Sequence, residues 1–129
     1  MSTQPTPSLD ILYRILIQTA RNQRYMHYED VSAEYQRMTG VFHHPHGSWD
    51  RPLGEINHIL HANGLPALSA VVVLKPDPPG GQVVPGGGFW GSCPSVPTRP
   101  RNDLQRLTEW SRILGVVHRA NWPDELPPG

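Results

Sequence analysis

The chain has 129 residues, 37% of them hydrophobic, and its eleven basic and eleven acidic side chains cancel to a formal net charge of zero. This length fits one domain, and the neutral charge argues against a dedicated duplex-binding protein, which usually carries a basic surplus where it faces the phosphates. The single cysteine, Cys93, excludes an internal disulfide, no apolar run reaches the roughly 20 residues that cross a bilayer, and the N-terminus lacks a signal-peptide pattern, so we expect a cytoplasmic protein without membrane attachment.

The first forty residues predict an arm, a helix, a short strand and a second helix. Prolines among small polar residues make residues 1–7 a flexible arm. Ser8 is a suitable N-cap for a helix that ends near Arg21, because apolar side chains recur there at helical spacing. Residues 25–28 predict a very short strand, and the acidic pair that follows opens a helix ended by Gly40.

The stretch 51–73 predicts a central helix followed by a buried strand. A proline-containing loop, VFHHPHGSW, precedes it, and Asp50 is the expected N-cap. Asn63 and Gly64 provide a left-handed stop for this helix. From Leu68 the sequence is β-branched and almost entirely apolar, which predicts a well-covered strand.

The last third predicts a hairpin and a closing helix. Residues 75–88 are mostly proline and glycine, which is typical of a flexible hairpin tip, and Phe89 would begin the returning strand. Asn102 is the expected cap of the last helix, with Gln105 at the capping-box position. Beyond Asn121 we expect a loose tail in which only Trp122 folds back.

Together these elements predict one α+β domain of winged-helix-like architecture. Its order is helix, short strand, two helices, a two-stranded wing and a C-terminal helix. The domain would span residues 8–120, between the flexible arm 1–7 and the C-terminal tail 121–129.

The glycine motif in residues 86–91, GGGFWG, matches G-x-G-x-x-G in letters only. A dinucleotide-binding loop needs a strand before the motif and a helix after it. Here Pro85 precedes it and Ser92-Cys93-Pro94 follow, so we interpret the motif as a hairpin turn. No cofactor is expected.

Histidines form the one cluster with metal-ligand chemistry. Zinc requires three or four nitrogen, sulfur or carboxylate ligands at defined distances. The spacing here matches no common zinc finger, and paired cysteines are missing, so a solvated loop and surface histidines are the preferred interpretation. The low-weight candidates for a metal site are His43, His44 and His46, with His58 and His61 on the next helix.

Nothing in the chain predicts a catalytic site. Cys93 lies between Ser92 and Pro94, without a helix N-terminus that would activate its thiol, and Ser69 lacks a nucleophile-elbow context. The carboxylates are scattered, with no obvious acid–base pair. We therefore expect a protein that is not an enzyme.

The outward side of the central helix is the remaining functional candidate. Arg51, Glu55, His58 and His61 lie opposite its apolar positions. In a winged helix this side would enter a DNA groove, with Lys75 on the wing as a second contact. Alternatively it is an ordinary solvated face, since Glu55 at its centre would repel phosphate.

Four segments resemble the DNA-binding domain of alkylguanine DNA alkyltransferases and alkyltransferase-like proteins. They are residues 28–33 (YEDVSA), 51–54 (RPLG), 64–73 (GLPALSAVVV) and 87–91 (GGFWG), in the family's order. The resemblance implies a winged-helix-type fold that binds DNA through the minor groove, with Tyr28 at the phosphate and Arg51 as the wedge that flips a base. The family's acceptor segment falls at residues 66–69, which contain no cysteine, so alkyl transfer is not expected.

Two functions follow as hypotheses. The leading one is a non-enzymatic winged-helix module that binds nucleic acid, in particular duplex DNA. The alternative is a protein-interaction module, such as a phage or prokaryotic accessory protein that inhibits or adapts a larger host complex, because tryptophans are common interface anchors. The expected nucleic-acid or partner contacts are Tyr28, Arg51, Glu55, His58, His61 and Lys75.

Overall fold

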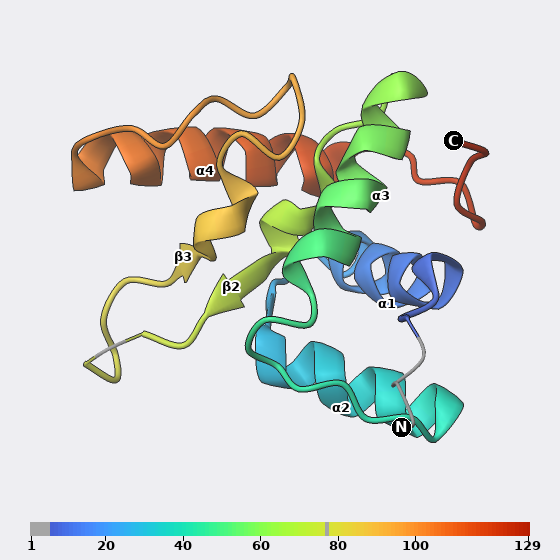
Figure 1. Ribbon diagram of the computed structural model, residues 1–129. Coiled ribbons are helices and arrows are strands. Elements are labelled where there is room, and N and C mark those ends of the chain that lie inside the picture. Colours follow the sequence, from blue (N-terminus) through green and yellow to red (C-terminus); the bar gives the residue numbers. More distant parts are fainter. Residues whose placement is uncertain (1–5, 77) are drawn as a thin grey trace.

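The computed structural model describes residues 6–76 and 78–129, and it confirms a small winged-helix-like α+β arrangement. Most of the predicted arm therefore lies outside the described residues. Figure 1 shows four helices packed around a short sheet, with the hairpin projecting at one side. The elements are α1 (Leu9–Arg21), β1 (Met26–His27), α2 (Tyr28–Thr39), α3 (Asp50–Ala62), η1 (Leu68–Val71), β2 (Val72–Leu74), β3 (Val84–Pro85), η2 (Gly87–Phe89) and α4 (Asp103–Arg119).

The helix ends follow the capping residues closely. The Ser8 side chain accepts a hydrogen bond from the Ile11 amide at the start of α1, and Asn102 accepts one from the Gln105 amide at the start of α4, so both predicted N-caps are confirmed. Gly40 and Gly64 end α2 and α3 at positive φ values of 79° and 73°, as their lack of a side chain allows.

The start of α3 differs from the prediction by one residue. Trp49 occupies the N-cap position, and Asp50 is the first helical residue. The carboxylate of Asp50 therefore lies in the first turn, where the helix dipole favours a negative charge.

The sheet is smaller than the sequence pattern suggests. β2 pairs with β1 in parallel, with Met26 opposite Val72, and with β3 in antiparallel orientation. The strand predicted from Leu68 begins only at Val72, because residues 68–71 form the 3-10 turn η1. All four η1 residues are buried, and η1 contacts α1, α3 and α4, whereas a strand would send alternate side chains to opposite faces.

The returning strand also lies earlier than predicted. It is Val84–Pro85, and the expected strand start at Phe89 instead belongs to the 3-10 turn η2. A Cβ on Gly86 would lie 2.1 Å from the Tyr28 hydroxyl oxygen, so the hairpin backbone passes directly over α2. This close approach requires a residue without a side chain at position 86, and the η2 turn that follows buries Phe89.

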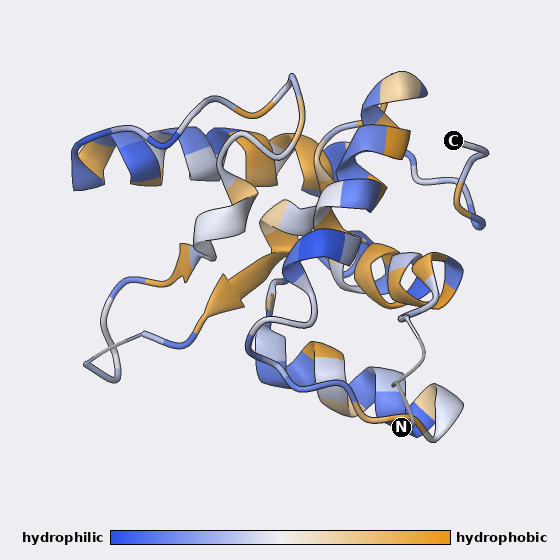
Figure 2. Ribbon diagram, in the orientation of Figure 1, coloured by the Kyte–Doolittle hydropathy of each residue, from blue (hydrophilic) through white to orange (hydrophobic). Residues whose placement is uncertain are grey.

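One hydrophobic core joins all the helices. Figure 2 shows the apolar colours gathered on β2 and on the sides of α1 and α4 that face inward. η1 lies at the centre of this core, and the Trp110 indole N–H donates 2.9 Å to the Ala70 carbonyl, which joins α4 to it. No helix of the described residues is long and apolar enough to cross a membrane.

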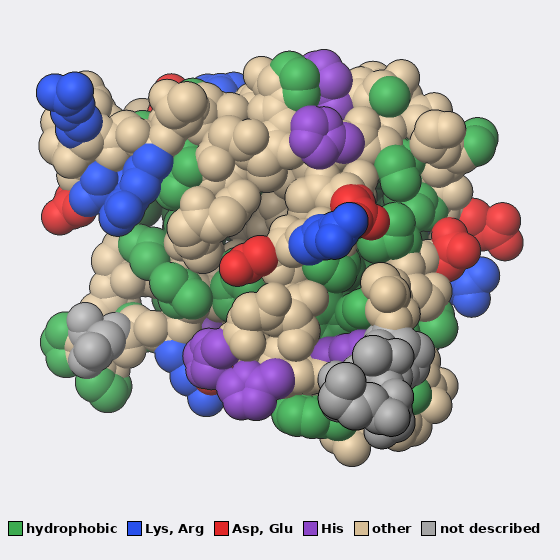
Figure 3. All heavy atoms as spheres, in the orientation of Figure 1, with side chains coloured by type: hydrophobic (Ala, Val, Ile, Leu, Met, Phe, Trp, Pro, Cys, Tyr) green, Lys and Arg blue, Asp and Glu red, His purple; other side chains and the backbone are tan. Residues whose placement is uncertain are grey.

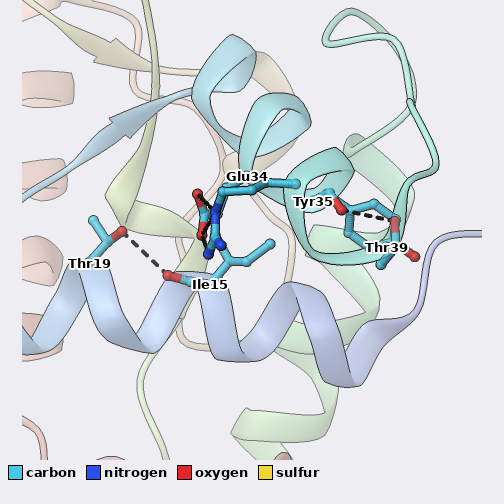
Figure 4. A network of polar contacts seen from close by, with 6 residues as sticks. Ile15, Thr19, Glu34, Tyr35 and Thr39 are labelled. Atoms are coloured by element: carbon cyan, nitrogen blue, oxygen red, sulfur yellow. Dashed lines mark hydrogen bonds and ion pairs between the residues drawn. The ribbon is translucent and has the colours of Figure 1, made fainter.

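Polar contacts join α1 to α2, and threonine hydroxyls form hydrogen bonds within each of these helices. The Ser8 amide donates 2.8 Å to the Tyr35 hydroxyl, which joins the start of α1 to α2. Figure 4 shows the hydroxyls of Thr19 and Thr39 donating to the carbonyls one turn earlier, at 3.4 and 2.8 Å. These bonds keep the threonines within the helices without exposing an unpaired donor.

The C-terminal residues are held against the domain, so the expectation of a loose tail is wrong. Trp122 is buried, as foreseen, and its indole N–H donates 2.9 Å to the Val117 carbonyl. The Tyr13 hydroxyl donates 2.6 Å to the Pro123 carbonyl, and Arg21 forms an ion pair with Asp124 at 2.9 Å. The tail lacks helix and strand, yet side chains from α1 fasten it.

Candidate nucleic-acid interface

The loop between α2 and α3 is anchored by aromatic side chains. The Trp49 indole is buried and donates 2.8 Å to the Ser32 hydroxyl. Its ring packs edge to face on Tyr35 and His43, with centroids 5.3 and 5.5 Å away. This cluster holds the loop and the residue before α3 against α2, and sequence reasoning did not assign Trp49 that role.

α3 presents one buried and one exposed side. Leu53, Ile56 and Leu60 are buried as predicted. Asn57 is buried as well, and its amide donates to the hydroxyls of Ser69 and Ser92 at 2.7 and 2.9 Å, which ties α3 to η1. A lone Asn on an apolar face was the only sequence signal for this network.

The structure brings Arg51, Glu55, His58 and His61 together on the exposed side of α3, as predicted. The Arg51 side chain is 90% exposed at the start of the helix. In Figure 3 basic and acidic side chains meet at the centre of this face, with histidines gathered above and below them. The face is therefore accessible, although its charges alternate in sign.

Each cation of the predicted site has a carboxylate partner. The Arg51 Nε lies 3.1 Å from Glu55 Oε1, one helical turn away. The Lys75 Nζ lies 3.1 Å from Glu29 Oε2 and so joins the hairpin to α2. Burial acts to raise the pKa of Glu29, but its own backbone amide and Lys75 outweigh it and lower the pKa below its usual value.

Tyr28 is buried, in contrast to the other predicted contacts. Burial, reinforced by the charge of Asp50, raises the pKa of Tyr28 to about 12, and a backbone hydrogen bond from Gly86 acts in the opposite direction. Its hydroxyl lies against the backbone of Gly86, which follows β3 and is itself buried. Tyr28 thus supports the end of the hairpin from below.

The candidate metal ligands are spread over different environments. His43 is buried against Tyr35 and Trp49, whereas His44 and His46 are exposed and joined by a bond from the His46 amide to His44 Nδ1 at 3.1 Å. Among the described residues, no three His, Cys, Asp or Glu side chains gather in a way that could hold a metal ion. Cys93 is buried with its thiol 3.1 Å from the Ser95 hydroxyl.

A second surface was not anticipated from the sequence. A groove of about 790 Å³ lies between the β2–β3 hairpin and the first half of α4. Three large apolar side chains on its lining are exposed to solvent, namely Leu74, Val84 and Leu104. They come from segments that are distant in sequence, which is why no local pattern indicated the groove.

Comparisons with protein-family models, with curated proteins and with solved structures found no match to this chain. The structure thus defines this protein by its fold, as a small winged-helix-like α+β domain.

Proposed function

We propose that the protein is a non-enzymatic winged-helix module that binds nucleic acid, duplex DNA in the first instance, through the outer face of α3 and the hairpin beside it. The observation that carries this proposal is the placement of Arg51. Its side chain is 90% exposed at the start of a helix whose opposite side is fixed in the core.

The contact works by exchange of ion-pair partners. A phosphate or a guanine edge accepts the forked guanidinium of Arg51 as well as a carboxylate does. Glu55 holds Arg51 extended along the helix until that exchange takes place. His58 and His61 lie farther along the same face. Lys75, which lies on the hairpin and pairs with Glu29, would contact a phosphate of the nucleic acid.

Fluorescence anisotropy with a labelled duplex at about 50 mM salt tests the proposal, since phosphate contacts are strongest at low salt. We expect binding that weakens as salt rises, and Arg51→Ala should cost about 1 kcal/mol or more. Arg112→Ala is the matched control, because Arg112 forms a similar ion pair with Glu109 on α4. Absence of binding to duplex and single strands at low salt would refute the proposal.

A protein-interaction module, acting as an accessory protein that inhibits or adapts a larger host complex, is the second candidate. The exposed apolar side chains of the groove favour it, since such side chains mark interaction surfaces when they are contiguous. The two candidates share Lys75 of the hairpin but otherwise use different residues, so variants of Arg51 on α3 and of Leu104 in the groove separate them.

A further inference from the structure

The groove between the hairpin and α4 has three large apolar side chains on its lining that are exposed to solvent. Leu104 is 73% exposed, and Leu74 and Val84 are 40% and 43% exposed. Figure 1 shows the hairpin and the beginning of α4 on the same side of the molecule. The groove is lined by residues from both. Its volume, about 790 Å³, falls within the range of ligand-binding clefts.

The exposure of the apolar side chains that α4 contributes to the groove decreases along the helix. Trp110 is buried at the inner end of the groove, Leu107 is partly buried, and Leu104 stands in the first turn of the helix. The core stripe of α4 consists of Trp110, Ile113 and Val117. Leu104 therefore adds little to the core, whereas a partner covering it would remove a large apolar side chain from water, which favours association.

The charges on the lining have a basic excess. Three cations line the groove, Lys75, Arg99 and Arg106, and the one carboxylate that the described residues place on its lining is Asp103. Arg106 is engaged by Asp103 and by the Pro100 carbonyl at 2.7 Å, and Lys75 by Glu29. Within the part of the chain that the structure describes, Arg99 forms no ion pair.

This combination selects among possible occupants. Two copies of the groove would oppose basic surfaces, which disfavours self-association through it. A nucleic-acid strand would satisfy the cations but would leave Leu74, Val84 and Leu104 facing phosphates. Figure 3 shows basic side chains above hydrophobic ones at this end of the molecule, so the complementary surface carries carboxylates beside apolar anchors.

We propose that this groove binds a segment of a partner protein in which Asp or Glu side chains accompany large apolar residues. The apolar residues cover Leu74, Val84 and Leu104, and a carboxylate pairs with Arg99. The inference rests on the second candidate function, and it does not depend on nucleic-acid binding by α3.

Selection from a library of random peptides displayed on phage, with the full chain as bait, identifies the preferred chemistry. We expect enrichment of sequences that combine Asp or Glu with Leu, Phe or Trp. A labelled peptide from that selection then serves as the probe in anisotropy measurements. Enrichment of basic sequences, or no enrichment at all, would overturn the proposal.

Paired variants locate the site. Leu104→Asp should weaken binding of the selected peptide at least about tenfold, since the apolar contact with the peptide is lost and a charge of the same sign as the peptide's is added. Ser111→Asp adds the same charge to an exposed position of α4 outside the groove and should leave binding unchanged. Thermal melting of both variants checks that the fold is intact, since neither position is buried.

A charge reversal tests the acidic component separately. Arg99→Glu should weaken binding of the acidic peptide, and a new selection with this variant should enrich Lys and Arg. Arg119→Glu, at the other end of α4 and outside the groove, should have neither effect. If Leu104→Asp and Arg99→Glu leave the selected peptide bound as tightly as before, the peptide lies elsewhere and the assignment of the groove fails.

The failure of each proposal is distinguishable from that of the other. Arg51→Ala should alter binding of duplex and leave the peptide unaffected, since Arg51 lies outside the groove. If a DNA duplex displaces the peptide, and if Arg99→Glu weakens binding of that duplex, the groove binds nucleic acid instead of an acidic peptide. Peptide binding without any duplex binding would refute the nucleic-acid function and support the protein-interaction function.

Discussion

At the scale of single residues, the Arg51–Glu55 pair governs the α3 face. We expect Glu55→Gln to tighten binding of a DNA duplex by about two- to fivefold, because it removes a like charge and releases Arg51 from an exposed ion pair worth roughly 0.2–1 kcal/mol. Anisotropy titrations of both proteins at one salt concentration measure the effect. Glu109→Gln, which releases Arg112 on α4, is the control. Equal affinities for Glu55→Gln and the parent chain would remove Arg51 from the interface.

Gly86 is a second residue whose environment makes a sharp prediction. A Cβ there would lie 2.1 Å from the Tyr28 hydroxyl oxygen, whereas a Cβ on Gly87 meets nothing within 4 Å. Gly86→Ala should therefore lower the free energy of unfolding by about 1–3 kcal/mol through overpacking. Chemical denaturation, with Gly87→Ala as the matched control, checks this. Equal stability of the two variants would show that the hairpin lifts away from α2 without cost.

At the scale of elements, the tail acts as part of the core although it has no regular structure. Trp122 is buried against Tyr13 with their rings edge to face, and its N–H is bonded to the Val117 carbonyl. Trp122→Ala should lower the free energy of unfolding by about 3–5 kcal/mol. Asp124→Ala, which breaks only an exposed ion pair with Arg21, should cost less than about 1 kcal/mol. Denaturant titrations of the two variants distinguish a packed tail from a loose one, for which both changes would be small.

The wing and η1 show how packing changes elements that local patterns describe only in part. The apolar run 68–74 has the composition of a strand, yet its first four residues turn tightly because α1, α3 and α4 surround them. The lack of a side chain at Gly86 allows the backbone after β3 to pass over Tyr28, and the strand pairing ends just before it, at Pro85. In both cases burial from several directions overrides the two-residue alternation of a strand.

At the scale of the whole molecule, buried tyrosines make stability depend on alkaline pH. Burial raises the pKa of Tyr28 and of Tyr13 to about 12, from an ordinary value of 10.0. The folded state binds these protons more tightly than the unfolded state does, so the stabilisation is complete below pH 10 and is lost as the pH rises toward 12. At one pKa unit per 1.36 kcal/mol, Tyr28 accounts for roughly 2–3 kcal/mol, and Tyr13, whose hydroxyl is only partly buried, accounts for less because solvent screens it.

Denaturant unfolding measured between pH 9 and 12 should show the free energy of unfolding fall, mainly above pH 10, where the unfolded tyrosines begin to lose their protons. In Tyr28→Phe the decline with pH should be shallower, because one of the two linked groups is gone. Tyr25→Phe removes a hydroxyl at an exposed position and is the control. An unchanged slope in Tyr28→Phe would contradict the burial of its hydroxyl in solution.

Sequence alone determined the features that depend on neighbouring residues. Apolar spacing and caps such as Ser8, Asn102 and Gly40 placed the helices, because helix ends satisfy their own backbone groups locally. Helical geometry likewise placed Arg51, Glu55, His58 and His61 on one exposed face.

Only the tertiary structure decided what depends on segments far apart in the chain. It buried Tyr28 under Gly86, paired Lys75 with Glu29, placed Trp49 in the core and fixed the tail on α1. It also formed the groove from β2, β3 and α4, whose apolar side chains are unremarkable in their own segments. Burial and ion pairing are properties of side chains that meet in space, so the spacing of residues along one helix or strand does not encode them.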